Sequence, residues 1–289
     1  MRMKWVVTKN ISILLRLKLL FLFLCFFGKE VNSQPADTLR LEHLYNLEAR
    51  AVQFYLDHLG QSYAITANNE LIKYNTEGIE LFRYADKRYG RLDFVDVSNP
   101  MQLLLYYGNF NYVVILERTL TNSGFLSLQE LGFPVVQAIS MGMDGNIWLY
   151  DSFNARLVKV NRKGIRIRES AELTLLLGRR PEIIRLREKG GKVYAIDKEN
   201  KRLYVFDLMG QWLRERILPQ DLTGELIFED EAIMEISNEG LVFMSLTDPL
   251  YYRRAYFPTT FPSFRHVAWR KERIYNVGID GVISVYEMK

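Results

Sequence analysis

The sequence predicts an all-β fold, a six-bladed β-propeller of four-stranded antiparallel blades, from three observations. One segment recurs with a constant offset of 46 residues, at 144–164 and again at 190–210. Glycines at the ends of such segments follow one another at intervals of 40 to 46 residues. Runs of five to eight residues rich in Val, Ile, Tyr and Leu alternate with polar turns. A repeat of about 40–45 residues with four strands is typical of a propeller blade.

The two strong repeats share four residues at matching positions. These are Asp151, Asn154, Arg156 and Gly164 in the first, and Asp197, Asn200, Arg202 and Gly210 in the second. Weaker copies end at Gly78 and Gly124, so the four glycines lie 46, 40 and 46 residues apart. Each glycine is predicted to lie in a polar turn between two strands, where a positive φ favours glycine over other residues.

Six strand quartets can be laid out along the chain. They are 51–86, 91–132, 135–170, 182–218, roughly 226–262, and 264 onward. The last set has only three strands, and the segment Thr38–Tyr45, which alternates polar and apolar residues, is predicted to supply the fourth. This pairing would close the ring and remove two open sheet edges. Rings of five or seven blades are the alternatives.

The two strong repeats resemble NHL-type propeller repeats. The shared pattern is Asp-Gly, an apolar strand, Asp, two residues, Asn, one residue, Arg, an apolar strand and Gly. The resemblance covers two repeats well and two loosely, and it implies a propeller without implying a function. We expect Asp151 and Asp197 to accept turn N–H groups, the two Asn to adopt the left-handed conformation, and the two Arg to pair back to the Asp. Ligand contact is the alternative role.

Residues 1–33 have the pattern of a secretory signal peptide. Five basic residues and no acid lie within 1–18, and the apolar run Leu19–Phe27 follows. Nine helical residues span about 13 Å, well short of a membrane core about 30 Å thick. Cleavage after Ser33 would leave a mature propeller of residues 34–289 in the periplasm or at the cell surface. An uncleaved signal anchor and a lipid anchor on Cys25 are the alternatives.

Removal of the leader changes the charge balance. Residues 1–33 hold six of the 38 basic residues and one of the 34 acids, so the mature chain has one acid more than it has bases. This near-neutral balance gives no electrostatic case for nucleic acid or anionic lipid as a partner. The single cysteine, Cys25, leaves with the leader, so the mature chain is predicted to have no disulfide and no cysteine metal site.

Polar residues recur at one level of the predicted innermost strands, which line the central channel of a propeller. They are Gln53, Asp93, Gln137, Arg185, Glu235 and His266, with an ambiguity of one residue in blades four and five. This ring is a candidate ligand site, and the alternative is a hydrogen-bonded, water-filled channel that binds nothing. Calcium prefers several converging oxygen ligands, so this mixed set predicts neither a metal nor another cofactor.

Aromatic and basic residues crowd into the least regular blade and form a second candidate site. The predicted interface residues are Tyr251, Tyr252, Arg253 and Tyr256, with Arg254 and Phe257 beside them. Tyr and Arg are enriched among the residues that dominate interface energetics. Aromatic packing between neighbouring blades is the alternative explanation.

Sequence patterns of catalysis are scarce. None of the three histidines lies in a metal-binding spacing, and no serine lies in a Gly-x-Ser-x-Gly frame. Asp93 and Asp96 are three apart on a predicted strand and therefore face opposite sides. We expect a non-catalytic binding or scaffold protein that holds a protein or a glycan on one propeller face, as a monomer or in an envelope complex. The alternative is a hydrolase or lyase with its site at the channel mouth.

Overall fold

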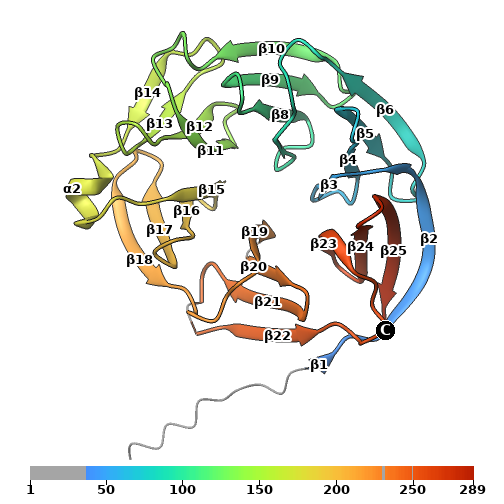
Figure 1. Ribbon diagram of the computed structural model, residues 1–289. Coiled ribbons are helices and arrows are strands. Elements are labelled where there is room, and N and C mark those ends of the chain that lie inside the picture. Colours follow the sequence, from blue (N-terminus) through green and yellow to red (C-terminus); the bar gives the residue numbers. More distant parts are fainter. Residues whose placement is uncertain (1–36, 230–231, 249) are drawn as a thin grey trace, which may run out of the picture. The chain divides into compact units, whose positions relative to one another are not determined.

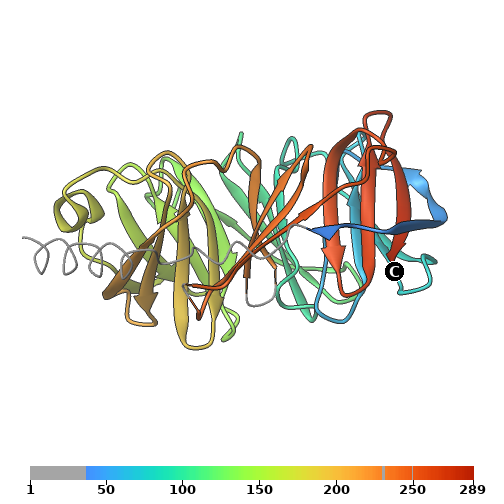
Figure 2. The same cartoon turned by 90° about the horizontal axis from the view of Figure 1, so that it is seen from below.

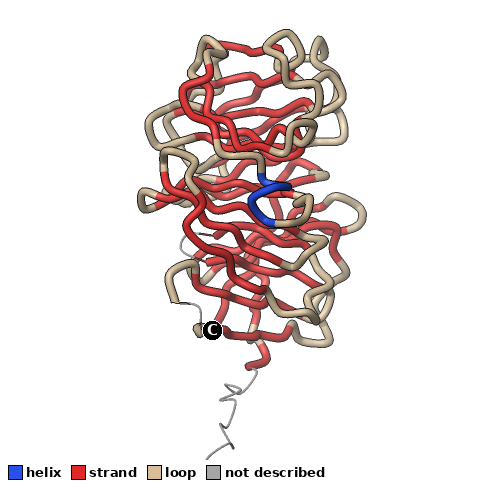
Figure 3. The backbone as a smooth tube through the Cα atoms, turned by 90° about the vertical axis from the view of Figure 1, so that its left-hand side faces the viewer, coloured by secondary structure: helices blue, strands red, loops and turns tan. Residues whose placement is uncertain are grey.

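The computed structural model describes residues 37–229, 232–248 and 250–289. The predicted signal peptide, residues 1–33, lies outside the described residues. Residues 37–289 form one unit, an all-β ring of six blades around a central channel (Figure 1). A short helix, α2 (Leu173–Leu177), lies between the third and fourth blades (Figure 3). No described helix is long and apolar enough to cross a membrane.

The first three blades follow the predicted quartets closely. Blade one is β3 (Gln53–Leu56), β4 (Ser62–Ile65), β5 (Glu70–Tyr74) and β6 (Glu80–Ala85). Blade two is β7 (Phe94–Asp96), β8 (Gln102–Tyr107), β9 (Tyr112–Glu117) and β10 (Asn122–Ser127). Blade three is β11 (Val136–Met141), β12 (Ile147–Asp151), β13 (Arg156–Val160) and β14 (Arg166–Glu169). In each blade the four strands pair in chain order, as in a meander.

The other three blades include the ring closure. Blade four is β15 (Ile183–Lys189), β16 (Lys192–Asp197), β17 (Arg202–Asp207) and β18 (Trp212–Ile217). Blade five is β19 (Glu225–Glu229), β20 (Ala232–Ser237), β21 (Gly240–Ser245) and β22 (Tyr252–Tyr256). Blade six is β23 (Phe264–Arg270), β24 (Arg273–Gly278) and β25 (Val282–Met288), with β2 (Leu41–Arg50) as its outer strand. Figure 2 shows the strands running between the two faces of the ring.

The N-terminal strand closes the ring, as predicted. β2 pairs antiparallel with β25, from Leu41 opposite Met288 to Arg50 opposite Val282. The closing strand therefore occupies 41–50, later in the chain than the predicted 38–45. Before it, β1 (Asp37–Thr38) pairs in parallel with β22 and gives blade five a fifth strand. The N-terminal segment thus holds two neighbouring blades.

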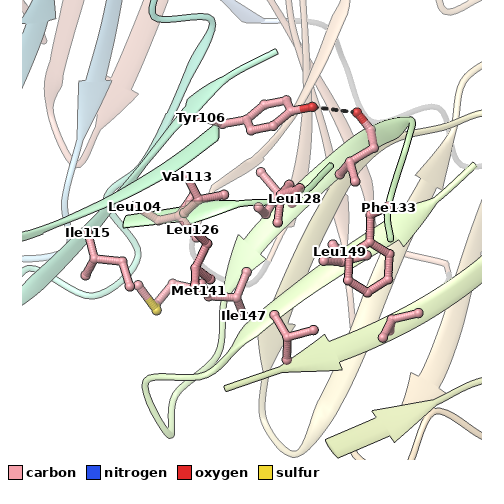
Figure 4. Close-up of a cluster of buried hydrophobic side chains, with 14 residues drawn as sticks. Leu104, Tyr106, Val113, Ile115, Leu126, Leu128, Phe133, Met141, Ile147 and Leu149 are labelled. Carbon is pink, nitrogen blue, oxygen red and sulfur yellow. Dashed lines mark hydrogen bonds between the residues drawn. The ribbon is translucent and has the colours of Figure 1, made fainter. Parts of the chain in front are cut away.

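Apolar clusters lie between neighbouring blades, because each strand directs alternate side chains to opposite faces of its sheet. Figure 4 shows the cluster between blades two and three, where Leu104, Val113 and Ile115 pack against Ile147 and Leu149. All five are fully buried or nearly so. The hydroxyl of Tyr106 donates to the carbonyl of Val136 in the next blade at 2.8 Å. Packing of this kind between blades is what holds the ring together.

The repeated Asp and Asn form a turn network, but not with the predicted backbone conformation. Asn154 Nδ2 donates to Asp151 Oδ2 at 2.7 Å, and the matching bond in blade four joins Asn200 to Asp197 at 2.8 Å. The left-handed residue is the one after each Asn, Ala155 with φ 51° and its counterpart Lys201 with φ 49°. The Asn side chain is used for the hydrogen bond, and the next residue reverses the chain.

The prediction that the repeat arginines pair back to the aspartates is wrong. Arg156 pairs instead with Glu169 on the outer strand, at 2.7 Å. Arg202 pairs in the same way with Glu215, at 3.8 Å. The aspartate oxygens already accept turn N–H groups and, in Asp197, the hydroxyl of Tyr204, so each arginine joins the third strand of its blade to the fourth.

Three of the four repeat glycines lie in left-handed turns as predicted. Gly78, Gly164 and Gly210 have φ of 82°, 79° and 85°. Gly124 differs, because it lies inside β10 at a register shift. The turn before β10 uses Leu120 instead, with φ 59°.

Candidate functional site

The channel contains a cavity of about 270 Å³, and four of the six predicted ring residues line it. Gln53, Arg185 and His266 lie on the innermost strands β3, β15 and β23, and Asp93 immediately precedes β7. The inner strands of blades one, two, four, five and six contribute to the wall. The sequence pattern therefore identified a lining residue in four of the five blades that contribute to the wall.

Gln137 and Glu235 do not line the cavity. Gln137 is exposed at a register shift between Val136 and Ala138, so Ala138 takes the place that corresponds to Arg185 and His266. A β-bulge of this kind displaces the extra residue from its expected face. Glu235 lies on β20, the second strand of blade five, where its buried carboxylate accepts the backbone N–H groups of two residues before β19.

Glu225 occupies the channel position that was predicted for Glu235. It begins β19, the innermost strand of blade five. Arg185 donates to Glu225 Oε1 at 2.9 Å, and His266 Nδ1 lies 3.3 Å from Glu225 Oε2. The short apolar run Leu226–Phe228 is the sequence signal for this strand, but the longer apolar run around Glu235 gives the stronger pattern and belongs to the second strand.

His266 joins three blades. Its Nε2 lies 2.8 Å from the backbone carbonyl of Phe54 in blade one, while Nδ1 faces Glu225 in blade five. A backbone carbonyl only accepts hydrogen bonds, so Nε2 is the donor to Phe54, while Nδ1 lies within hydrogen-bond distance of Glu225. The imidazole therefore links blade six to the blade on either side.

Four residues further along β23, Arg270 repeats this arrangement. Arg270 pairs with Glu229 of blade five at 3.2 Å and donates to the carbonyl of His58 in blade one at 2.8 Å. Glu229 lies four residues after Glu225, and His58 lies four residues after Phe54, the two partners of His266. Two matched sets of contacts thus fasten the inner strand of blade six to its neighbours.

Aromatic side chains cover the rest of this part of the cavity. Tyr55 donates its hydroxyl to Gln53 Oε1 at 2.5 Å, and its ring lies edge-on to Phe94 with centroids 6.0 Å apart. The Arg185 guanidinium lies 5.5 Å from the centre of the Phe94 ring. Burial raises the pKa of Tyr55 well above its usual range, so the phenol stays neutral.

Asp93 and Asp96 both line the cavity, contrary to the prediction that they face opposite sides, because Asp93 lies just before β7; they nevertheless have separate partners. Asp93 Oδ1 pairs with Arg91 at 2.7 Å, and Asp93 Oδ2 accepts the N–H of Gly108 at 2.8 Å. Asp96 is buried and accepts the hydroxyl of Ser140 in blade three at 2.9 Å. Among the described residues, no group of three or more His, Cys, Asp or Glu is arranged to hold a metal ion.

The pKa of Glu225 predicts a contribution to acid stability. Burial raises this pKa, but the hydrogen bonds and charges of His266 and Arg185 outweigh burial and hold it at about 2, against an ordinary 4.5. A carboxylate with a lowered folded-state pKa stabilises the fold above pH 4.5, and this contribution disappears as pH falls toward 2. Because solvent screens a side chain that is 41% exposed, we expect Glu225 to contribute only about 1 kcal/mol to the free energy of unfolding.

Melting temperatures of Glu225→Gln and the parent between pH 7 and 2 measure this contribution. The variant should be less stable at pH 7, and the difference should close between pH 4.5 and 2. Glu199→Gln, at an exposed turn position, is the matched control and should follow the parent throughout. A Glu225→Gln difference that is the same at pH 7 and pH 2 would contradict the assignment.

The predicted interface residues divide between two surfaces, because successive residues of β22 point in opposite directions. Tyr252 packs against the apolar cluster between blades four and five, and Tyr256 lies opposite Thr38 of β1. Tyr251 and Arg253 instead border a groove between blades five and six. Tyr251 and Arg253 therefore share the groove, while Tyr252 and Tyr256 lie on the other face of the strand.

The groove has a volume of about 530 Å³, and three aromatic residues line it. Phe243 and Trp269 come from the two blades, and their rings meet edge to face with centroids 4.3 Å apart. Tyr251 is 44% exposed at the edge. Sequence reasoning missed Phe243 and Trp269 because they lie in ordinary strands, 26 residues apart in the chain.

No protein-family model matches the sequence, and no curated protein matches it. Among solved structures, a catalytically inactive variant of virginiamycin B lyase from Staphylococcus aureus, with quinupristin, aligns over 87% of this chain and 99% of its own. The two are 12% identical, with a TM-score of 0.61. The Pan2 WD40 domain of Neurospora crassa aligns over 88% of this chain and 97% of its own, at 9% identity and a TM-score of 0.57. At sequence identities this low, the structural similarity shows the propeller fold alone.

Proposed function

We propose that the chain is an exported, non-catalytic binding module whose ligand, a protein or a glycan, binds in the groove between blades five and six. The groove itself is the observation that carries this proposal. It is concave, its volume falls within the range of about 300–1,000 Å³ usual for ligand sites, and its floor is aromatic with polar groups around it. Trp, Tyr and Arg, all present here, are the residue types that contribute most to binding.

The hydrogen bonds and ion pairs of the channel acids favour a binding function over a catalytic one. The acids that line the cavity are engaged within the protein: Glu225 and Glu229 in ion pairs with cations, Asp93 with Arg91, Asp96 with Ser140, and Asp57 with the hydroxyl of Tyr63. A hydrolase or lyase at this position would need one of these acids or His266 to leave its partner before it could move a proton of the substrate. One solved neighbour is a lyase, but at 12% identity the likeness extends to the fold.

The proposal of export depends on residues 1–33, with their basic start, short apolar run and expected cleavage after Ser33. Outside the cytoplasm, a near-neutral mature chain with an aromatic groove is suited to a polymer or a protein of the envelope. We expect the module to act alone or within an envelope complex.

Photo-crosslinking in the cells that make the protein tests the proposed function. With p-benzoylphenylalanine in place of Tyr251, irradiation should give a discrete covalent adduct in the envelope fraction. The matched control carries the same group in place of Phe125, which is 60% exposed on the outer strand of blade two. Adduct formation at neither position, or equally at both, would contradict a site in the groove. The intact mass of the unmodified protein should correspond to a chain that starts at Gln34.

A further inference from the structure

The floor of the groove is apolar and consists of two aromatic rings set edge to face. Trp269 donates its only polar hydrogen, on Nε1, to the carbonyl of Lys271 at 2.7 Å. The ring of Phe243 stands against the indole, and both side chains remain partly exposed. A ligand on this floor therefore contacts carbon atoms. The hydrogen bond of the indole N–H to Lys271 stays intact when the ligand binds.

The polar groups at the groove carry both signs of charge. Deep in the groove, Arg270 and Glu229 form an ion pair at 3.2 Å. At the edge, Asp248, Arg253 and Lys271 are exposed, one acid and two bases. The ligand therefore meets hydrogen-bond donors and acceptors side by side, and the excess of a single positive charge among these groups is too small to select a strongly charged partner.

An aromatic floor with donors and acceptors around it matches the surface of a sugar ring. A pyranose presents C–H groups on its face, which pack on an aromatic ring, and hydroxyls at its edge, which both donate and accept.

We infer that the groove binds a neutral oligosaccharide, with one sugar ring on the indole of Trp269 beside Phe243 and its hydroxyls bonded to Asp248, Arg253 and Lys271. This inference rests on the proposed function, since it names the ligand class of the same site. The inference goes beyond the proposed function because it names an oligosaccharide, and not a protein, as the ligand of the groove.

The mass of the crosslinked group identifies the ligand class. After irradiation of the Tyr251 derivative, the tryptic peptide that carries position 251 should gain a mass composed of hexose or N-acetylhexosamine units. A gain composed of amino-acid residues would overturn the oligosaccharide and leave the proposed function standing. If no adduct forms, both are wrong.

A glycan array measures the site with defined probes, using the protein isolated from the cells that make it. We expect saturable binding to neutral oligosaccharides, weakened roughly tenfold or more by Trp269→Ala. Trp212→Ala is the matched control, since Trp212 is 41% exposed on the outer strand of blade four. Lys271→Asn tests the edge without threatening the fold, because Asn tolerates the left-handed φ of 52° found there. Binding that survives both groove variants unchanged would overturn the inference.

Discussion

A chain that lacks residues 34–50 is expected to lose most of its stability and to aggregate. The deletion removes β1 and β2, and with β2 the whole ladder of backbone hydrogen bonds to β25. It also removes Leu47, which is 6% exposed in the cluster between blades six and one. The edge of β25 would then be open to pairing with other molecules. The expected loss is several kcal/mol of a total of about 5–15 kcal/mol.

Thermal melting and light scattering after size exclusion test this deletion. Two point variants separate strand packing from chain length. Leu47→Ala should cost about 2–5 kcal/mol, while Leu44→Ala, at a position 38% exposed beside a register shift, should cost little. A synthetic peptide of residues 34–50 should restore melting of the truncated protein. A truncated chain that stays monomeric with an unchanged melting temperature would show that the closure contributes nothing to stability.

The blades could be predicted from the sequence because their signals are local and repeated. Strand-length apolar runs and the turn glycines at Gly78, Gly164 and Gly210 recur with the period of the blade. The closing strand was found by elimination, since blade six lacked one strand and the N-terminal segment alternated. Its bounds were not found, because the register of β2 depends on two irregularities opposite β25.

The channel was harder to predict because single-residue bulges decide which side chain faces it. Gln137 lies at such a bulge and turns away, while Arg185 and His266, just after the bulges in their own strands, face the cavity. Nothing in one sequence marks a bulge when the residues on either side are equally apolar. The contact of Glu225 with both Arg185 and His266 joins three blades and has no local signature at all.

The groove, like the channel, could be predicted only in part from the sequence. Tyr251 and Arg253 were found by their composition, but composition does not distinguish the two faces of β22. The partners that make a concave site, Phe243 and Trp269, come from two blades and meet only through the ring. Residue types therefore suggested an interface, and the packing of two blades determined which of them share it.

Glu188→Ala is expected to be the most damaging single substitution in the interface between blades three and four. Glu188 lies on β15 with its side chain 4% exposed, and it accepts three hydrogen bonds: from Lys159 Nζ at 2.9 Å, Trp148 Nε1 at 2.6 Å and the N–H of Met143 at 2.9 Å. Its loss would leave the buried Lys159 ammonium with only the exposed Asp144, and would leave two N–H donors without an acceptor. Breaking a buried ion pair costs about 3–5 kcal/mol.

For a domain of this size, a loss of that magnitude lowers the melting temperature by roughly 6–20 °C. Glu182→Ala, an exposed acid in the same segment, should change it by no more than a degree or two, because surface substitutions of this kind cost about 0.5 kcal/mol or less. Glu188→Gln keeps an acceptor oxygen for Trp148 and should fall between the two. A double-mutant cycle with Lys159→Met then isolates the ion pair, because removal of both charges takes away the uncompensated ammonium that makes the single variant costly. If Glu188→Ala melts within a degree of the parent, the blades are held by their apolar clusters alone.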